Sequence, residues 1–462
     1  MALAASTGIL NEVPYSYAAH WGMPAEIARR RTALVNTFGT GSSPAYAIVQ
    51  DMQHRDVDVL MLYPLDLVAV EERFGSWMAQ YAYTNYVTAA KLLERGRVNG
   101  KVIEMAGRKF TTLVAMFEPF PSKKLLDMMK QFAGQGGRVI WSGPPPVLTF
   151  EGEPALPVWQ DLFGVDYEPG QDEGVIVPGR EVRFEGTLMK VAPQMILTDF
   201  LVDRIYPVRP RPGTATVAKV RNWIVGAQKG NAVFLGYRPR DDQAQSLGYD
   251  VRNWFEVLRA AGAYAGSDNT EVLSRTGKYL ACRFPNGAVA VAPHLKDLEE
   301  DWPGGFARDT EADKKWVEKN PLPPETFTLK EFKAGGHTVT YSGAHALSFR
   351  VGAKGELAAF SGRKTKEISV DGRRTVFADR EMNEIAWAPV AKERLVEGGA
   401  VMQILVSGEG TVRIPASGVE LVAEGTTPGS RGAKVESKQE GGTVVFTVTG
   451  PLSGKWVYGV KK

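Results

Sequence analysis

The sequence has very little cysteine, because Cys282 is the one cysteine among 462 residues. A single thiol excludes an intrachain disulfide framework, a cysteine-rich zinc site and an iron–sulfur cluster. The five histidines are scattered without metal-ligand spacing, so the sequence predicts no metal site and no cofactor. Common catalytic motifs are also missing: there is no Walker-type phosphate loop, no GxGxxG after a strand, no GxSxG elbow and no HExxH.

The chain also has no large excess of positive or negative charge. The formal net charge is +3, from 55 basic and 52 acidic residues spread without blocks, which gives no reason to expect binding to nucleic acid or to an anionic membrane. No apolar run reaches the roughly 18 residues of a membrane-spanning helix. The opening MALAASTGIL has no basic region and too short an apolar stretch for a secretory signal. We therefore expect a soluble, cytoplasmic protein of two or three domains.

The first half of the chain has the pattern of an α/β domain. Three apolar runs, DVDVLMLYPLD (56–66), FTTLVAMFEPF (110–120) and RVIWSGPPP (138–146), are typical of strands buried on both faces, as in parallel sheets. NAVFLGYRP (231–239) resumes this pattern after an interruption. Strands that alternate with helices predict a doubly wound sheet.

Two helices are expected between these strands. A helical pattern covers Ser76 to Arg95 and ends at Gly96. SKKLLDMMKQFAGQGG is amphipathic, with Ser122 as the N-cap and glycines at its end. Its inner face is expected to consist of Leu125, Leu126, Met129 and Phe132.

The sequence pattern changes beyond the α/β domain. ACRFPNGAVAVAP carries the Asn-Gly signal of a hairpin, and from His337 onward short strands recur with glycine-rich turns, which favours an antiparallel β-sandwich. We expect an α/β domain over 56–266 with a β-rich insertion near 147–213. The remaining expected parts are an N-terminal segment (1–55), a hairpin and connector (267–330) and the sandwich (331–462).

Two groups of residues are candidates for binding a substrate. The stretch NEVPYSYAAHWGMP combines aromatic faces with acid and base groups, which suits a sugar pocket; its candidates are Glu12, Tyr15, Tyr17, His20 and Trp21. Packing of an N-terminal helix on the α/β domain is the alternative for this stretch. The second group, Arg238, Asp241 and Asp242, follows the carboxyl end of a strand, where open α/β sheets bind ligands. A salt bridge within the loop, or contact with a neighbouring domain, is the alternative there.

The order of these pieces resembles a known module. LYPL at a strand end, a proline before the amphipathic helix, QGGRVIWSGPPP and GNAVFLGYRPRDDQ are similar to the glutamine amidotransferase-like domain of large glycoside hydrolases related to bacterial β-galactosidases. That resemblance implies a flavodoxin-like, class I glutamine amidotransferase-like sheet followed by a β-sandwich. It covers residues 56–266 well and the rest by architecture alone.

In that family the module is a degenerate amidotransferase that has lost its cysteine. The matching turns here, Trp141-Ser142-Gly143-Pro144 and Met116-Phe117-Glu118, carry no cysteine, and Cys282 lies outside the domain. A thiolate needs a partnered base, and the α/β block has no histidine. We therefore expect no catalytic residue in this block. The resemblance instead implies that this block helps to assemble an oligomer, commonly a trimer, and forms part of the wall of a sugar pocket.

The family's chemistry is performed by two carboxylates on a (β/α)₈ barrel, which needs about 250 residues. Only residues 1–55 precede the first expected strand, and they resemble the end of such a barrel. The favoured hypothesis is therefore a non-catalytic or incomplete glycoside-hydrolase-type protein acting in carbohydrate degradation. Its expected partners are carbohydrate, further copies of itself, or a separate barrel chain. The alternatives are an independent hydrolase with a site at the carboxyl edge of the sheet, and a carbohydrate-binding protein that uses exposed Trp residues of the sandwich. Trp387, on an expected strand, is expected in the sandwich core rather than on a carbohydrate platform.

Overall fold

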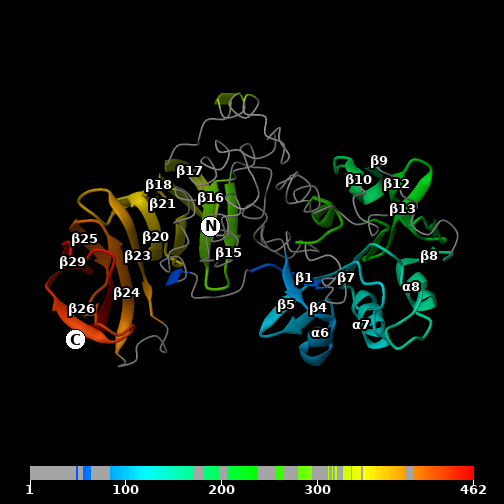
Figure 1. Ribbon diagram of the computed structural model, residues 1–462, viewed down its shortest axis with the longest axis horizontal. Coiled ribbons are helices and arrows are strands. Elements are labelled where there is room, and N and C mark those ends of the chain that lie inside the picture. Colours follow the sequence, from blue (N-terminus) through cyan, green and yellow to red (C-terminus); the bar gives the residue numbers. More distant parts are fainter. Residues whose placement is uncertain are drawn as a thin grey trace. The chain divides into compact units, whose positions relative to one another are not determined.

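A computed structural model (Figure 1) describes residues 48–49, 56–63, 84–169, 180–196, 205–237, 256–264, 279–293, 311, 315, 318–319, 326–334, 336–344, 347–390 and 399–461. The described residues are mostly β-strand and lie in several sheets. They fall into two compact units. One lies within residues 57–270, and the other comprises the described residues up to Asp56 together with those beyond residue 270.

The first unit is built around a mixed sheet, which has nine strands within the described residues. In the order in which they lie, the strands are β10 (Gln194–Ile196), β9 (Arg180–Phe184), β12 (Ala215–Val220), β13 (Trp223–Lys229), β14 (Ala232–Leu235), β7 (Arg138–Ser142), β6 (Thr112–Met116), β1 (Val59–Leu62) and β2 (Asn85–Val87). The run β14-β7-β6-β1-β2 is parallel throughout. Strands β10, β9, β12 and β13 extend it through an antiparallel pairing of β13 with β14.

The parallel strands are buried on both faces, which explains their continuous apolar sequences. One face packs in a hydrophobic core with helices α7 (Lys123–Gly134) and α8 (Leu156–Phe163) and includes Leu60, Leu113, Ala115, Val139, Trp141 and Phe234. The intervening side chains are also buried; these include Val59, Met61, Val114, Ile140, Val233 and Leu235.

Helix α7 forms as the sequence predicts. The side chain of Ser122 accepts a hydrogen bond from the backbone N–H of Leu125 at 3.2 Å, which satisfies a donor that the first turn would otherwise leave unpaired. Its buried residues are Leu125, Leu126, Met129 and Phe132, the face that the 3.6-residue period predicts.

The helix expected over Ser76 to Arg95 is wrong at Asn85–Val87 and confirmed over Ala89–Arg95, while residues 76–83 lie outside the described residues. Residues Asn85–Val87 form strand β2, and helix α6 spans only Ala89–Arg95. The helix begins there because the Thr88 side chain accepts a hydrogen bond from the N–H of Lys91 at 3.2 Å. Its end at Gly96 is confirmed.

Smaller elements complete this unit. A three-stranded meander precedes β6, and a two-stranded pair lies next to α8. The meander consists of β3 (Arg97–Asn99), β4 (Val102–Met105) and β5 (Arg108–Phe110), and the pair consists of β8 (Val165–Asp166) and β11 (Arg209–Pro210). A 3₁₀ helix, η2 (Gly186–Leu188), follows β9.

The second unit consists of antiparallel sheets that pack face to face, the arrangement of a β-sandwich. The larger sheet contains β15 (Tyr279–Arg283), β16 (Ala288–Pro293), β19 (Leu347–Val351), β20 (Leu357–Thr365), β23 (Met382–Pro389), β24 (Ala400–Ser407), β30 (Trp456–Lys461), β26 (Val419–Glu424) and β27 (Arg431–Val435). The smaller sheets contain β17 (Thr326–Ala334), β18 (His337–Ala344), β21 (Glu367–Val370) and β22 (Arg373–Val376), and β25 (Gly410–Pro415), β29 (Thr443–Val448) and β28 (Ser437–Glu440).

The hairpin expected around Asn-Gly belongs to the larger sheet of this sandwich. Strands β15 and β16 pair antiparallel, and β16 pairs with β19. The turn closes when Asn286 Oδ1 accepts a hydrogen bond from the N–H of Ala288 at 2.9 Å. Gly287 supplies the positive φ of 82° that the turn requires.

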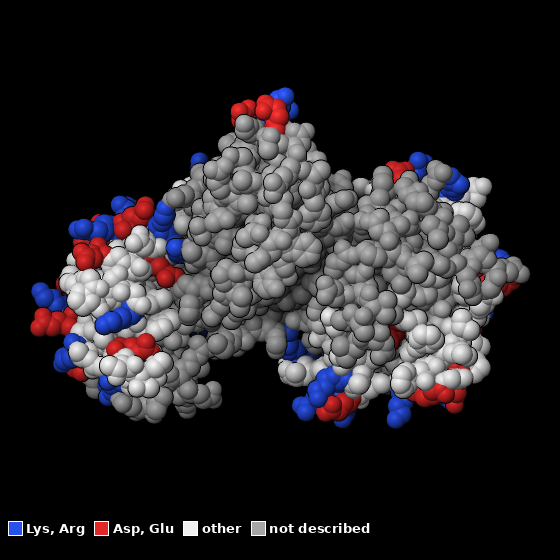
Figure 2. All heavy atoms as spheres, in the orientation of Figure 1, with Lys and Arg blue, Asp and Glu red and all other residues white. Residues whose placement is uncertain are grey.

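Charged side chains of both signs are interspersed over the described surface in Figure 2, as the small net charge suggests. Within the described residues, no helix has the length and apolar character needed to cross a membrane.

Candidate functional site

The substrate-binding residues that the sequence predicts lie outside the described residues. They are Glu12, Tyr15, Tyr17, His20, Trp21, Arg238, Asp241 and Asp242. Their roles stay predictions. The chain that precedes Arg238 is described as far as Tyr237, so the end of the strand before the second group lies within the described residues.

The carboxyl ends of the parallel strands lie at one edge of the sheet. Tyr63 follows β1, Phe117 follows β6, Ser142 ends β7, and Gly236 follows β14. In open α/β sheets, ligands bind in the crevice outside these ends, at the point where the strand order reverses. Here the reversal falls between β1 and β6, next to Tyr63 and Phe117.

The turn after β6 is strained. Phe117 has φ of 55°, in the left-handed region that costs a residue with a side chain about 1–2 kcal/mol. Its N–H donates to the carbonyl of Ser142 at 2.7 Å, and the residue is only 6% exposed. Strained backbone at a strand end is typical of a turn that presents a nucleophile. The residue held in that geometry here is a phenylalanine.

The phenyl ring of Phe117 lies against the neighbouring turn. A Cβ atom added to Gly143 would come within 3.2 Å of Cδ2 of Phe117, and Gly143 has φ of 107°. The space between the ends of β6 and β7 is therefore filled by an apolar ring and a glycine backbone. Neither group can accept or transfer a proton.

Ser142 is the nearest hydroxyl to this turn along β7, and it has a structural role. It is fully buried, and its Oγ donates to the carbonyl of Tyr237 at 2.5 Å. This bond ties the end of β7 to the segment that follows β14. Tyr237 is itself fully buried, and burial raises the pKa of its phenol, so it stays protonated.

The wider unit lacks two residue types that are common in nucleophilic catalysis. The sequence from residue 57 to 270 contains no cysteine and no histidine. Glu118 follows Phe117 and is half-buried, but glycoside hydrolysis needs two carboxyl groups on opposite sides of the bond. Across the described parts of the chain, no group of three His, Cys, Asp or Glu side chains could hold a metal ion.

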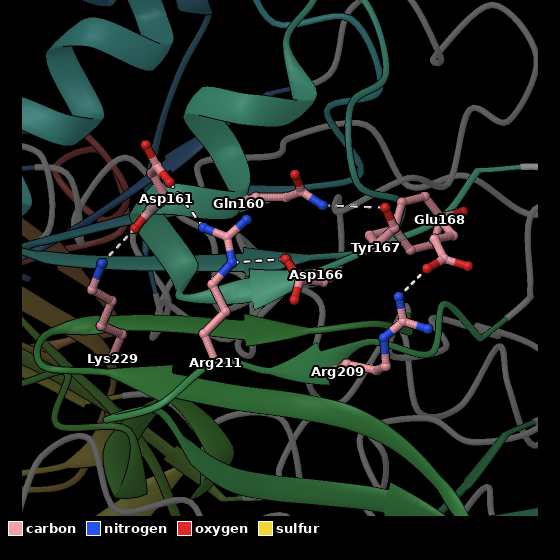
Figure 3. A network of polar contacts seen from close by, with 8 residues as sticks. All are labelled: Gln160, Asp161, Asp166, Tyr167, Glu168, Arg209, Arg211 and Lys229. Carbon is pink, nitrogen blue, oxygen red and sulfur yellow. Dashed lines mark hydrogen bonds and ion pairs between the residues drawn. The ribbon is translucent and has the colours of Figure 1, made fainter.

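A network of charged residues beside α8 also has a structural role (Figure 3). Arg211 bridges Asp161 of the helix, at 2.9 Å from Nη1, and Asp166 of β8, at 2.8 Å from Nε. Hydrogen bonding to Asp166 is the main cause that raises the pKa of Arg211. Lys229 donates to the carbonyl of Asp161 at 2.7 Å. These bonds fasten α8 to β8 and to the strand β13.

The expectation that Trp387 lies in the sandwich core is confirmed. Trp387 is 0% exposed and packs against Phe360 and Phe377 with ring centroids 5.1 and 5.3 Å away. A hollow of about 190 Å³ on the sandwich surface has no aromatic side chain in its wall. It is lined by Thr375, Val376, Arg413, Pro415, Glu440, Thr443 and Val445.

Comparisons with known proteins identify no family. No protein-family model matches the chain, and no curated protein matches it. Solved structures with a partial likeness include a β-galactosidase from Rahnella sp. R3, at 10% identity and a TM-score of 0.36. That match covers 58% of this chain and 39% of the other. A β-galactosidase from Bacillus circulans sp. alkalophilus is 10% identical over 57% of this chain and 38% of the other, with a TM-score of 0.37.

Another partial likeness is to α-L-fucosidase isoenzyme 2 from Paenibacillus thiaminolyticus. It is 10% identical over 95% of this chain and 52% of the other, with a TM-score of 0.27. This chain thus spans only about two fifths of the length of the two β-galactosidases. All three TM-scores are below 0.5, so these likenesses to glycoside hydrolases support no conclusion about this chain's activity.

Proposed function

We propose that the chain belongs to a glycoside-hydrolase-type protein in which both described units are non-catalytic. In this proposal the α/β unit is an assembly module that resembles a class I glutamine amidotransferase without its nucleophile. The β-sandwich follows it as a structural domain. Hydrolysis would be performed by two carboxylates on a (β/α)₈ barrel that these units accompany.

The order of the parallel strands supports a flavodoxin-like sheet. In space they lie as β2-β1-β6-β7-β14. Numbered by their place in the sequence, this is the order 2-1-3-4-5 of flavodoxin-like folds. Amidotransferase-like domains carry their nucleophile on a strained turn after a central strand, and β6 is the central strand of these five.

The observation that carries the proposal is the residue at that turn. Phe117 has the left-handed backbone of a nucleophile turn, with φ of 55°, but its side chain has no reactive atom. The absence of cysteine and histidine from residues 57–270 removes any thiol or imidazole that could replace it. A strained turn that is kept without its nucleophile is expected of a module that has retained its fold and lost its chemistry.

A hydrolysis assay on the purified chain tests this proposal. We expect no release of aryl alcohol from a panel of aryl β-galactosides, β-glucosides and α-fucosides above the rate of the heat-denatured chain. Glu12→Gln and Asp242→Asn variants are the matched controls for the two predicted groups of site residues. Turnover by the wild type that either variant abolishes would refute a non-catalytic chain and identify which group forms the site.

A further inference from the structure

One face of the larger sheet of the sandwich carries small side chains that are fully buried. In the row that crosses β15, β16, β19, β20 and β23, the residues directly opposite one another are Cys282, Ala290, Ser348, Ser361 and Ala386. Two residues away along these strands, and so on the same face, lie Ala288, Ala359 and Ala388. Each of these eight residues, here called the small-residue face, is at most 1% exposed.

The core of the sandwich lies on the opposite face of this sheet. The alternate residues of the same strands, such as Val289, Phe349 and Trp387, pack there with the smaller sheets. Within the described residues, none of the eight small residues takes part in a hydrophobic core. An alanine or serine on a sheet is fully buried only when a second layer lies directly on it. The small-residue face therefore needs a covering layer other than the smaller sheets.

Two hydroxyl groups in the middle of this face indicate what the covering layer must contain. Ser348 and Ser361 lie opposite each other on β19 and β20, and both are 0% exposed. Their Oγ atoms have no hydrogen-bond partner among the described residues. Because buried hydroxyls are paired in folded proteins, the covering layer should present polar atoms among its apolar side chains.

The chain before the α/β unit is fastened to the edge of this face. The side-chain amide of Asn286, in the turn between β15 and β16, donates to the carbonyl of Val49 at 3.1 Å. The N–H of Asp56 donates to the carbonyl of Arg283, at the end of β15, at 2.9 Å. Ile48 and Val49 are 4% and 0% exposed. The segment that precedes Ile48 is thus tethered beside the edge strand of the small-residue face.

The sequence before this tether predicts a helix of matching size and character. Residues 24–38, PAEIARRRTALVNTF, have a proline in the first turn and are followed by a glycine. Ile27, Leu34 and Phe38 recur at helical spacing on one side. Arg31 lies among them and supplies polar atoms on that side. Such a helix is about 22 Å long, and the five strands of the face span about 19 Å.

We propose that residues 24–38 dock as a helix on the small-residue face of the sandwich. The other long segments outside the described residues fit less well, because residues 294–325 are charged and rich in proline and residues 265–278 are short and polar. The docked helix fastens the first group of sugar-binding candidates, Glu12 to Trp21, to the sandwich and not to the α/β unit. This inference goes beyond the proposed function, and the hydrolysis assay does not depend on it.

The native thiol on the face reports whether the helix covers it. Cys282 is the one cysteine of the chain and is 1% exposed, so iodoacetamide should alkylate the folded wild type slowly. Leu34→Asp/Phe38→Asp should raise the alkylation rate at least about tenfold, because both carboxylates would face the sheet. Arg29→Asp, on the opposite side of the helix, is the matched control and should leave the rate unchanged. Trp302→Asp tests residues 294–325 in the same way and should also leave it unchanged.

Disulfide cross-linking measures the contact in a chain whose apolar packing is nearly intact. In a Cys282→Ala background, Leu34→Cys should form an intrachain disulfide under mild oxidation with at least one of three cysteines placed on the face, by Ala290→Cys, Ser361→Cys or Ala386→Cys. Arg29→Cys should form none with the same three. The absence of a disulfide from all three Leu34→Cys pairs would overturn the proposal. An alkylation rate that rises in Trp302→Asp but not in Leu34→Asp/Phe38→Asp would also overturn it and would assign the face to residues 294–325.

Discussion

Within the described residues, the two units differ in whether any large aromatic side chain is exposed. In the sandwich, Phe360, Phe377 and Trp387 pack together and are fully buried. The α/β unit also has a buried cluster, made by Trp141, Trp159, Phe163 and Phe234, yet it leaves Phe120 and Phe150 exposed. The buried aromatic clusters stabilise the unit in which they lie, whereas Phe120 and Phe150, in the segments that follow β6 and β7, are left in contact with solvent.

Removing one core tryptophan from each unit is the largest expected effect. Trp159 and Trp387 are both 0% exposed, so Trp159→Ala and Trp387→Ala should each lower the free energy of unfolding by about 4 kcal/mol. Urea unfolding followed by circular dichroism measures both. Val376→Ala is the control, because Val376 is 42% exposed and its loss should cost less than about 0.5 kcal/mol. A Trp387→Ala variant as stable as the wild type would show that the sandwich tryptophan is not a core residue.

A methyl group added at Gly143, after β7, should have an intermediate effect on the free energy of unfolding because it crowds Phe117. Gly143→Ala places a methyl group 3.2 Å from Phe117 on a backbone with φ of 107°, and we expect a loss of about 2 kcal/mol. Gly213→Ala isolates the backbone strain, since Gly213 has φ of 83° and no atom within 4 Å of the added Cβ. It should cost about 1 kcal/mol. Equal losses for the two variants would mean that Phe117 does not fill the space between the strand ends.

The smallest expected effect is the contribution of Asp371, in the sandwich, to the pH dependence of the melting temperature. The N–H of Thr338 and then the ring of His337, at 2.8 Å, hold the pKa of Asp371 below its usual range. A carboxyl whose pKa is lowered by folding stabilises the protein above its unfolded pKa, and this contribution is lost as the pH falls through the folded pKa. The melting temperature should therefore fall below about pH 4, less steeply in Asp371→Asn than in the wild type. Asparagine tolerates the φ of 49° at this position, so parallel pH profiles would contradict the account.

The fold could be predicted where local signals agree with tertiary packing. Helix α7 has a capping serine and one apolar face, and both signals give the structure that forms. The sequence pattern predicts a helix at Asn85–Val87, and this prediction is wrong because the pairing of the segment with β1 is not local. Only the Thr88 cap, just before α6, marks the true start of that helix in the sequence.

The features of the sheet edge could be predicted only in part. The sequence identifies Met116-Phe117-Glu118 as a turn without a cysteine, but the left-handed backbone of Phe117 depends on a hydrogen bond to Ser142 from another strand. The exposure of Phe120 and Phe150 has the same kind of origin. It follows from how two proline-rich segments pair in space, and residue type alone would place both side chains inside.

The central claim is that the turn after β6 has the left-handed backbone of a nucleophile turn but carries a phenylalanine, so that the chain is non-catalytic. The most direct measurement is the initial rate of aryl alcohol release by the wild-type chain, by Glu12→Gln and by Asp242→Asn, at equal concentration. The account predicts three rates that equal the background of the denatured chain. A wild-type rate clearly above that background, and lost in either variant, would contradict it.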